Sequence, residues 1–135
     1  ALGSVTVICS DKTGTLTRNE MTVQRVLCAG LDVSVSGVGY APEGEFHVGA
    51  RAIDPDRHPA LALALRAGVL CNDARMAEQA GRWSVLGDPT EGALLVLGHK
   101  AGLLHAHTAA AWPRVDSIPF ESQHRFMATA HRDDE

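Results

Sequence analysis

The alternation of hydrophobic and polar positions predicts several short strands in the first third of the chain. Residues 4–9, SVTVIC, form a β-branched run between turn-forming residues. Such a run is typical of a buried strand in a parallel sheet. Residues 21–29 alternate loosely and predict a second strand, while residues 31–38 predict a third. The Gly- and Pro-containing stretch 37–44 is typical of a turn.

Two later stretches have the composition and spacing of helices. Residues 59–71 place apolar side chains on one face, with Pro59 suited to the first helical turn. Asp56 or His58 precedes this turn as a possible cap. A second helix is expected to begin at Asp88 and to run to about residue 101.

The remaining segments complete an irregular order of elements. Residues 72–81 are polar and predict a loop with a short helical piece, followed by a strand at 83–87. A weaker helix is expected at 105–112, and residues 115–120 and 126–131 predict a hairpin. After the first strand there is no βαβα alternation. We therefore expect an α+β fold, an antiparallel sheet with helices packed on it.

Composition narrows the possible classes of protein. Of the 135 residues, 45% are hydrophobic but only 4% are aromatic, so Ala, Val and Leu must build the core. The net charge is −4 and the basic residues are scattered, which argues against a nucleic-acid surface. The three cysteines lie far apart without CxxC spacing, so neither a disulfide framework nor a zinc site is expected. A reducing compartment fits this usage best.

Nothing in the sequence predicts a membrane span or a signal peptide. The longest apolar runs are far shorter than the roughly 20 residues that cross a bilayer. The first residues, ALGSVTVIC, lack a basic segment of the signal-peptide kind. Because the chain begins without Met and stops in the charged HRDDE, we expect a portion of a longer protein.

Residues 11–17, DKTGTLT, directly follow the first strand and carry the clearest chemistry. A carboxylate at the carboxyl end of a parallel strand lies where open α/β sheets place their ligands. Asp11 can attack phosphorus and form an acyl phosphate. Lys12 supplies positive charge, while Thr13 and the loop amides supply donors for the phosphate oxygens. Phosphoryl transfer of this kind also calls for Mg²⁺.

The longer run ICSDKTGTLT, continued by RNEMTV, resembles the phosphorylation signature of P-type ATPases. The resemblance implies that Asp11 is the aspartate phosphorylated by ATP, and that Lys12 and Thr13 contact the transferred phosphate. It also implies that the Asp11 side chain and the Thr13 carbonyl help to hold Mg²⁺. That metal site is incomplete in this sequence, which has no TGDGxND segment.

Two other functions remain as alternatives. A phosphatase of the haloacid-dehalogenase kind resembles a D-x-D pattern, in which the second Asp protonates the leaving group and activates water. Thr13 stands at that position, and a hydroxyl is a poor general acid or base. An acyl phosphate on Asp11 should therefore persist, as a pump requires. The second alternative is a nucleotide-binding or interaction module without catalysis, which the intact DKT run argues against for the parent protein.

Residues 87–94, GDPTEGAL, carry a second signal. Asp88 is expected as the N-cap of the helix, Pro89 as its first residue and Glu91 as the reciprocal acid of a capping box. The run also resembles the G-[DE]-x-T-E-x-A-L segment of type II P-type ATPase nucleotide domains. This resemblance implies that Glu91 lies near the adenine amino group and favours a calcium-pump-like member.

Residues 118–127, IPFESQHRFM, carry the third signal. In an ordinary hairpin, Phe120 would belong to the core. The run also resembles the family's I-x-F-x-[SR]-x-x-[KR]-x-M stretch, which implies that Phe120 stacks on adenine and that Arg125 lies near the nucleotide. The family commonly has Lys where Arg125 stands, and calcium pumps of muscle type have Arg where Ser122 stands.

Two further runs are expected to be structural. Residues 70–74, LCNDA, resemble type II members and should end a helix. His58-Pro59 resembles the His-Pro motif of heavy-metal P-type ATPases, but GDPTEGAL and the Phe120 run do not belong to that branch. We therefore interpret His58 as a residue at the start of a helix.

Taken together, the resemblance implies two domains. Residues 1–20 would be a strand and loop of the phosphorylation domain, and residues 21–135 a nucleotide-binding domain incomplete at its C-terminal end. The cofactors would be ATP and Mg²⁺. The partners would be the actuator, the rest of the phosphorylation domain and the membrane helices of a parent pump, with this portion on the cytoplasmic side.

Overall fold

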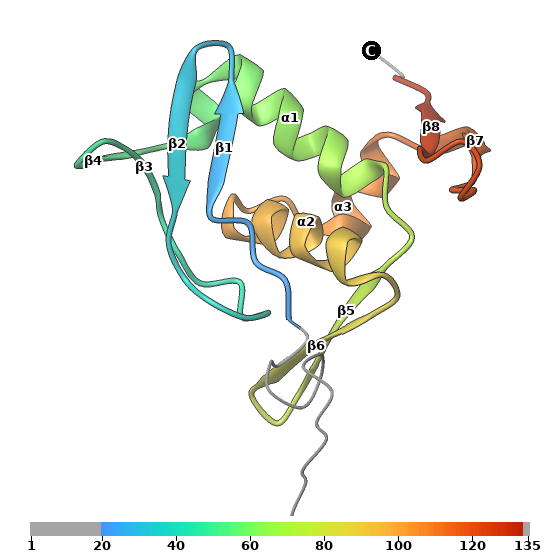
Figure 1. Cartoon of the computed structure of the whole chain (residues 1–135), viewed down its shortest axis with the longest axis horizontal. Coiled ribbons are helices and arrows are strands. Elements are labelled where there is room, and N and C mark those ends of the chain that lie inside the picture. Colours follow the sequence, from blue (N-terminus) through green and yellow to red (C-terminus); the bar gives the residue numbers. More distant parts are fainter. Residues whose placement is uncertain (1–19, 134–135) are drawn as a thin grey trace, which may run out of the picture.

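The computed structural model describes residues 20–133, and Figure 1 shows how their helices and strands are arranged. The strand expected at residues 4–9 and the DKTGTLT loop lie outside the described residues. No helix within residues 20–133 has the length and apolar character needed to cross a membrane. In chain order the elements are β1 (Arg25–Cys28), β2 (Leu31–Val35), β3 (Phe46–Val48), β4 (Arg51–Ile53), the 3-10 helix η2 (Pro55–Arg57), α1 (Pro59–Leu70), β5 (Arg75–Gln79), β6 (Arg82–Leu86), α2 (Pro89–Lys100), α3 (His105–Ala111), β7 (Arg114–Ile118) and β8 (Ala128–His131).

Within residues 20–133 the strands form three separate antiparallel sheets rather than the single sheet that the sequence led us to expect. One sheet has four strands in the order β1-β2-β3-β4, and the others are the hairpins β5-β6 and β7-β8. Strands β1 and β2 confirm the two predicted in this region. The strands β3 and β4 were not predicted, because three residues each give no recognisable alternation. The α+β character is confirmed.

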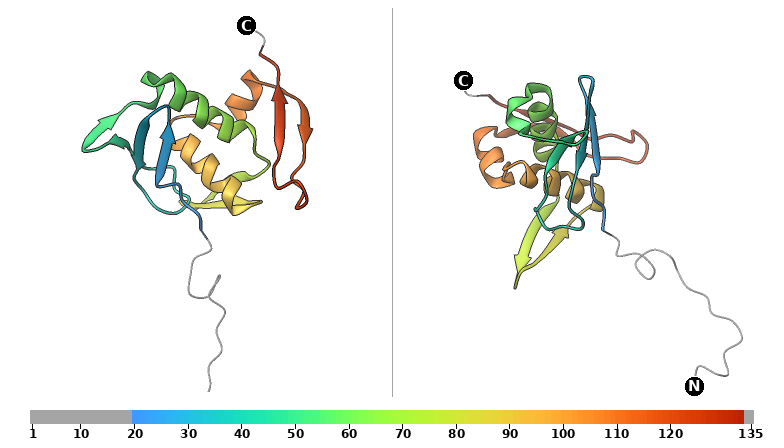
Figure 2. Two further views of the ribbon diagram at one scale, coloured as in Figure 1. Left: turned by 45° about the horizontal axis from the view of Figure 1, so that its top comes forward. Right: turned by 90° about the vertical axis from the view of Figure 1, so that its left-hand side faces the viewer.

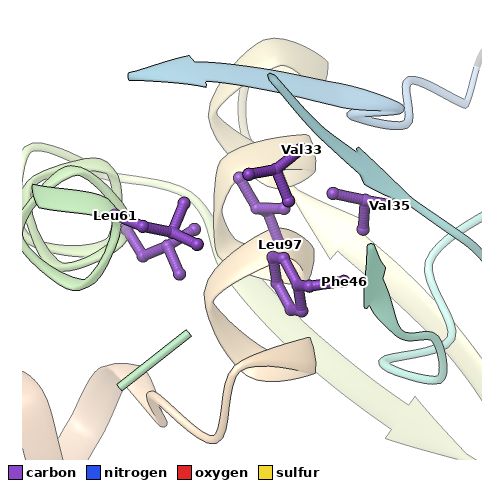
Figure 3. Packing of buried hydrophobic residues seen from close by; sticks show 6 residues of the cluster. Val33, Val35, Phe46, Leu61 and Leu97 are labelled. Atoms are coloured by element: carbon purple, nitrogen blue, oxygen red, sulfur yellow. The ribbon is translucent and has the colours of Figure 1, made fainter. Parts of the chain in front are cut away.

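The main core lies between the four-stranded sheet and the two long helices. Buried side chains of β2 and β3 face Leu61 of α1 and Leu97 of α2, as Figure 3 shows. At the α1–α2 contact, a side chain at Gly98 would collide with the Val69 side chain. Glycine at this position therefore lets the two helices approach closely.

The helix α1 confirms the prediction for residues 59–71. Pro59 is its first residue, and His58 occupies the N-cap position without a capping hydrogen bond from its side chain. The Asp56 cap is not formed, because Asp54 accepts from the Asp56 backbone and caps η2 instead. As expected for the LCNDA run, α1 ends at Leu70.

The prediction of a loop with a short helical piece at residues 72–81 is wrong over residues 75–79, which form strand β5, and residues 72–81 contain no helix. The five residues of β5 pair with β6 through a tight turn at Ala80 and Gly81, both with positive φ. Such a turn matches the right-handed twist of a hairpin. The sequence signal for this hairpin was weak, because Ala80-Gly81 is not the Asn-Gly or Asp-Gly pair that usually marks such a turn.

The hairpin β7-β8 confirms the predicted C-terminal hairpin, with strands shorter than expected. A bulge lies between Arg114 and Asp116, and every residue of β7 is exposed. The hairpin lies beside the C-terminal end of α1 (Figure 2). The Cys71 thiol is 3.9 Å from the Met127 carbonyl oxygen and connects the hairpin to the end of α1. The short helix α3 confirms the helix expected at 105–112.

Candidate nucleotide site

The residues of the predicted phosphorylation site, Asp11, Lys12 and Thr13, lie outside the described residues. Their roles therefore stay predictions from the sequence. Within residues 20–133, no group of three or more His, Cys, Asp or Glu side chains is placed to hold a metal ion. The candidate site that the structure describes is the one expected to contact nucleotide.

Asp88 caps the start of α2, as the sequence predicted. Its Oδ1 accepts hydrogen bonds from the backbone N–H groups of Thr90, at 2.8 Å, and Glu91, at 3.2 Å. These two bonds lower the pKa of Asp88, because they favour the ionised carboxylate. Pro89 follows as the first helical residue, where a missing N–H costs nothing. The orientation of the first turn of α2 is thereby fixed.

Glu91 does not act as the reciprocal capping acid. Its Oε2 instead accepts hydrogen bonds from the backbone N–H groups of Asp73, at 2.8 Å, and Ala74, at 3.0 Å. The fixed start of α2 points the Glu91 side chain across to the turn between α1 and β5. Both bonds end on Oε2, and no hydrogen bond described for residues 20–133 ends on Oε1. This second oxygen is a candidate acceptor for a ligand.

The side chain of Asn72 holds the same turn through hydrogen bonds. It is almost fully buried, and its amide nitrogen donates to the carbonyl oxygens of Gly68, at 3.2 Å, and Glu91, at 2.8 Å. Its side-chain oxygen accepts from the Ala74 backbone at 3.0 Å. Because a buried amide left unpaired is costly, these bonds fix the turn against α2.

Arg114 connects this turn to the C-terminal hairpin. Its guanidinium donates to Asp73 Oδ1, at 2.6 Å, and to the carbonyl oxygens of Leu70, at 3.1 Å, and Asn72, at 2.8 Å. It therefore ties the first residue of β7 to the end of α1. The sequence analysis missed Arg114 and Asn72, since their partners lie on other elements. The LCNDA run indicated only that the helix ends in this segment, not which contacts hold its end.

Phe120 lies in the connection between β7 and β8 and is 60% exposed. It does not belong to the core, so the ordinary hairpin interpretation of this residue is wrong. Ile118 and Phe126 are also about half exposed. Arg125, in the same connection, has a positive φ of 57° and donates its backbone N–H to the Glu121 carbonyl oxygen at 2.8 Å. An aromatic ring and a guanidinium thus share one exposed connection.

The structure brings together only some of the predicted nucleotide contacts. Phe120 and Arg125 share the β7-β8 connection, whereas Glu91 lies on α2. Among residues 20–133, no described hydrogen bond, ion pair or ring contact joins that connection to α2. The link between the two is indirect and runs through Asp73 and Arg114.

Comparisons with known proteins show the family to which the chain is similar. Residues 60–135 match the family described as P-type ATPase, cytoplasmic domain N. The chain is 51% identical to a cation-transporting ATPase, pma1, of Synechocystis sp., over 99% of its own length and 15% of the relative. It is 38% identical to a calcium-transporting ATPase of Bacillus subtilis, over 93% of this chain and 14% of the relative. It is 42% identical to calcium-transporting ATPase type 2C member 1 of Mus musculus, over 94% of this chain and 13% of the relative.

The family match covers more than half of the chain, and each of these relatives aligns with at least 93% of it. The chain belongs to the P-type cation-transporting ATPase family. It spans 13 to 15% of the length of these relatives.

Proposed function

We propose that residues 21–135 bind the adenine end of ATP within a cation-transporting ATPase, and that residues 1–20 carry its phosphorylation loop. The observation that carries this proposal is the exposure of Phe120 in the stretch that matches cytoplasmic domain N. Because Phe120 is 60% exposed, its ring is available to stack on an adenine base. Base–aromatic stacking is worth roughly 1–3 kcal/mol.

Glu91 and Arg125 complete the proposed contacts. The Glu91 carboxylate is held through Oε2, so Oε1 is the oxygen that would accept from the adenine amino group. Arg125 would lie near the nucleotide as the basic residue of the β7-β8 connection. The class of substrate is thus a purine nucleotide, with base recognition on this part of the chain.

The chemistry would take place at Asp11. Its carboxylate would attack the γ-phosphorus of ATP, the bond to the bridging oxygen would break, and ADP would leave. Lys12 would offset the charge on the transferred group, and Thr13 would help to position it. Bound Mg²⁺ would stabilise developing negative charge, with Asp11 and Thr13 supplying the hard oxygen ligands it prefers. Because Thr13 is no general base, the phosphate would persist on Asp11 while the parent protein changes conformation.

In the parent protein this cycle would drive cation transport across a membrane. The partners would be the actuator, the remainder of the phosphorylation domain and the membrane helices, with the described domain on the cytoplasmic side. The match to calcium-transporting relatives favours a type II, calcium-pump-like member.

The test is a titration of AMP, ADP and ATP into the 135-residue chain, followed by NMR. We expect binding around millimolar, about −4 kcal/mol, with the three nucleotides similar because adenine supplies the contacts. Phe120→Ala should weaken binding at least about fivefold, from the lower end of the stacking energy. Phe126→Ala is the matched control, since Phe126 is a half-exposed Phe of the same connection.

Equal loss in the two variants would show that Phe120 has no special role, and a strong preference for ATP over AMP would contradict recognition through adenine. In the full-length protein, Asp11→Asn should abolish incorporation of the γ-phosphate. In the 135-residue chain it should leave nucleotide binding intact. If the variant lost binding instead, the proposed division between residues 1–20 and the rest would be wrong.

A further inference from the structure

A pocket whose lining does not include Phe120 contains several basic side chains. It has a volume of about 250 Å³ and lies among the end of α1, the start of β5, α3 and the start of β7. Its lining includes Arg75, His105, Arg114 and His131, against a single acid, Asp73. The charges of Arg75 and Arg114 create a positive potential in this pocket, which an anion would offset. We propose that this pocket binds an oxyanion of the phosphate class, held by Arg75, His105 and Arg114.

Arg114 is already fixed in the position that such a site needs. Its guanidinium has three acceptors, on Leu70, Asn72 and Asp73, and its side chain is 32% exposed. A guanidinium carries more N–H donors than three acceptors use, so donors remain for a ligand. Because these bonds hold the side chain in place, an anion would not have to pay for ordering it.

Arg75 is the second guanidinium of the proposed site. It is the exposed first residue of β5, and within residues 20–133 no hydrogen bond or ion pair is described for its side chain. Asp73 is already paired with Arg114, so it leaves the charge of Arg75 uncompensated. Planar guanidinium groups match the oxygen geometry of phosphate, which makes two of them a recognisable phosphate-binding set.

His105, the first residue of α3, is the third proposed contact for the oxyanion. Burial, then the charges of Arg114 and Arg75, lower the pKa of His105. His99 of α2 also lies close enough to His105 to have its own pKa lowered, after the larger effect of burial. The imidazole of His105 therefore lies in a positive potential. An oxyanion in the pocket would offset this potential, favour the protonated ring and raise its pKa.

His131 borders the pocket without serving as a contact. Its Nδ1 is 2.9 Å from the Trp112 carbonyl oxygen, so this nitrogen donates, and its Nε2 is 2.9 Å from Thr129 Oγ1. Both ring nitrogens are thus used within the protein. The volume of the pocket corresponds to roughly eight water molecules, which is enough for a tetrahedral anion.

The experiment titrates inorganic phosphate into the 135-residue chain at neutral pH, with chloride at matched ionic strength as the comparison. The readouts are the imidazole signals of His105, their pKa, and the backbone amides of residues 73–75. We expect saturable shifts with phosphate and a raised pKa of His105. Arg75→Gln should weaken phosphate binding about two- to fivefold, the range for one exposed charge pair.

Arg82→Gln is the matched control. Arg82 begins the other strand of the same hairpin, and it pairs with Gln79 at the end opposite to Arg75. Removing this charge should leave phosphate binding unchanged. His105→Gln keeps a polar side chain at the third contact and should also weaken phosphate binding.

Parallel titrations with inorganic phosphate and AMP distinguish a free phosphate from the phosphate of a nucleotide. If inorganic phosphate and AMP compete for the pocket while Phe120→Ala leaves phosphate binding intact, the site recognises the oxyanion independently of adenine. Shifts of the same size with chloride, or an unchanged response in Arg75→Gln, would overturn the proposal. Because this site does not use Phe120, its failure would leave the proposed nucleotide site unaffected, and the reverse also holds.

Discussion

Glu91 both stabilises the turn between α1 and β5 and is a proposed nucleotide contact, so its replacement by Ala gives the sharpest prediction. The change removes an ionised acceptor from the backbone N–H groups of Asp73 and Ala74. Hydrogen bonds to charged groups contribute roughly 1.5–3 kcal/mol. Ala74 keeps a second acceptor, the side-chain oxygen of Asn72 at 3.0 Å. Water can also reach the Asp73 end, so we expect a loss at the lower end of the range, about 2 kcal/mol.

Urea unfolding monitored by the fluorescence of Trp83 and Trp112 would measure this loss. At a slope of roughly 1–3 kcal/mol per molar urea, the midpoint should fall by about 1 M without a change in slope. Glu91→Gln keeps an uncharged acceptor and should lose about half as much. The control is Glu78→Ala. Glu78 accepts one bond at 3.1 Å from the Gly81 backbone within its own turn, and its loss should cost less than about 0.5 kcal/mol.

Hydrogen exchange supplies a second, independent readout. In Glu91→Ala the Asp73 amide loses its described acceptor, whereas the Ala74 amide keeps one. Exchange at Asp73 should therefore accelerate more than exchange at Ala74. Unchanged stability together with unchanged exchange at both amides would refute the reasoning, because it would mean that Glu91 does not hold this turn in solution.

Two further predictions concern the start of α2. Asp88→Ala should remove its cap and cost about 1 kcal/mol, while Asp88→Asn should retain most of the stability; equal melting temperatures for Asp88→Ala and wild type would contradict the cap. Because the folded pKa of Asp88 is lowered, the stability that its ionised side chain contributes is present above the ordinary pKa of 3.8 and is lost as pH falls through the folded pKa. The melting temperatures of Asp88→Asn and wild type should therefore converge in acid. Gly92→Ala would place a Cβ 2.8 Å from Val85 Cγ2, so we expect overpacking of roughly 1–3 kcal/mol to outweigh the helix gain of about 1 kcal/mol. Chemical denaturation should then show recovery in the double variant with Val85→Ala, and a stabilised single variant would contradict the close packing.

The sequence alone determined the elements whose signals are local. The start of α2 could be predicted because Asp88 and Pro89 act within one turn of each other. The apolar face of α1 repeats at helical spacing, and the C-terminal hairpin has two strand-forming runs around a polar connection. The family itself could also be recognised, because DKTGTLT and GDPTEGAL are contiguous runs that need no tertiary contact to be identified.

The tertiary structure decided where those elements pack and which side chains meet. Strand β5 exists through its pairing with β6, so its polar sequence alone indicated a loop. Glu91 seemed to belong to a local capping box, but its acceptor oxygen bonds amides 17 and 18 residues away. Phe120 was expected by default in the core of an ordinary hairpin, and its exposure excludes that position. For Glu91 the deciding partners lie far away in sequence, and a local pattern carries no information about a contact that chain folding creates.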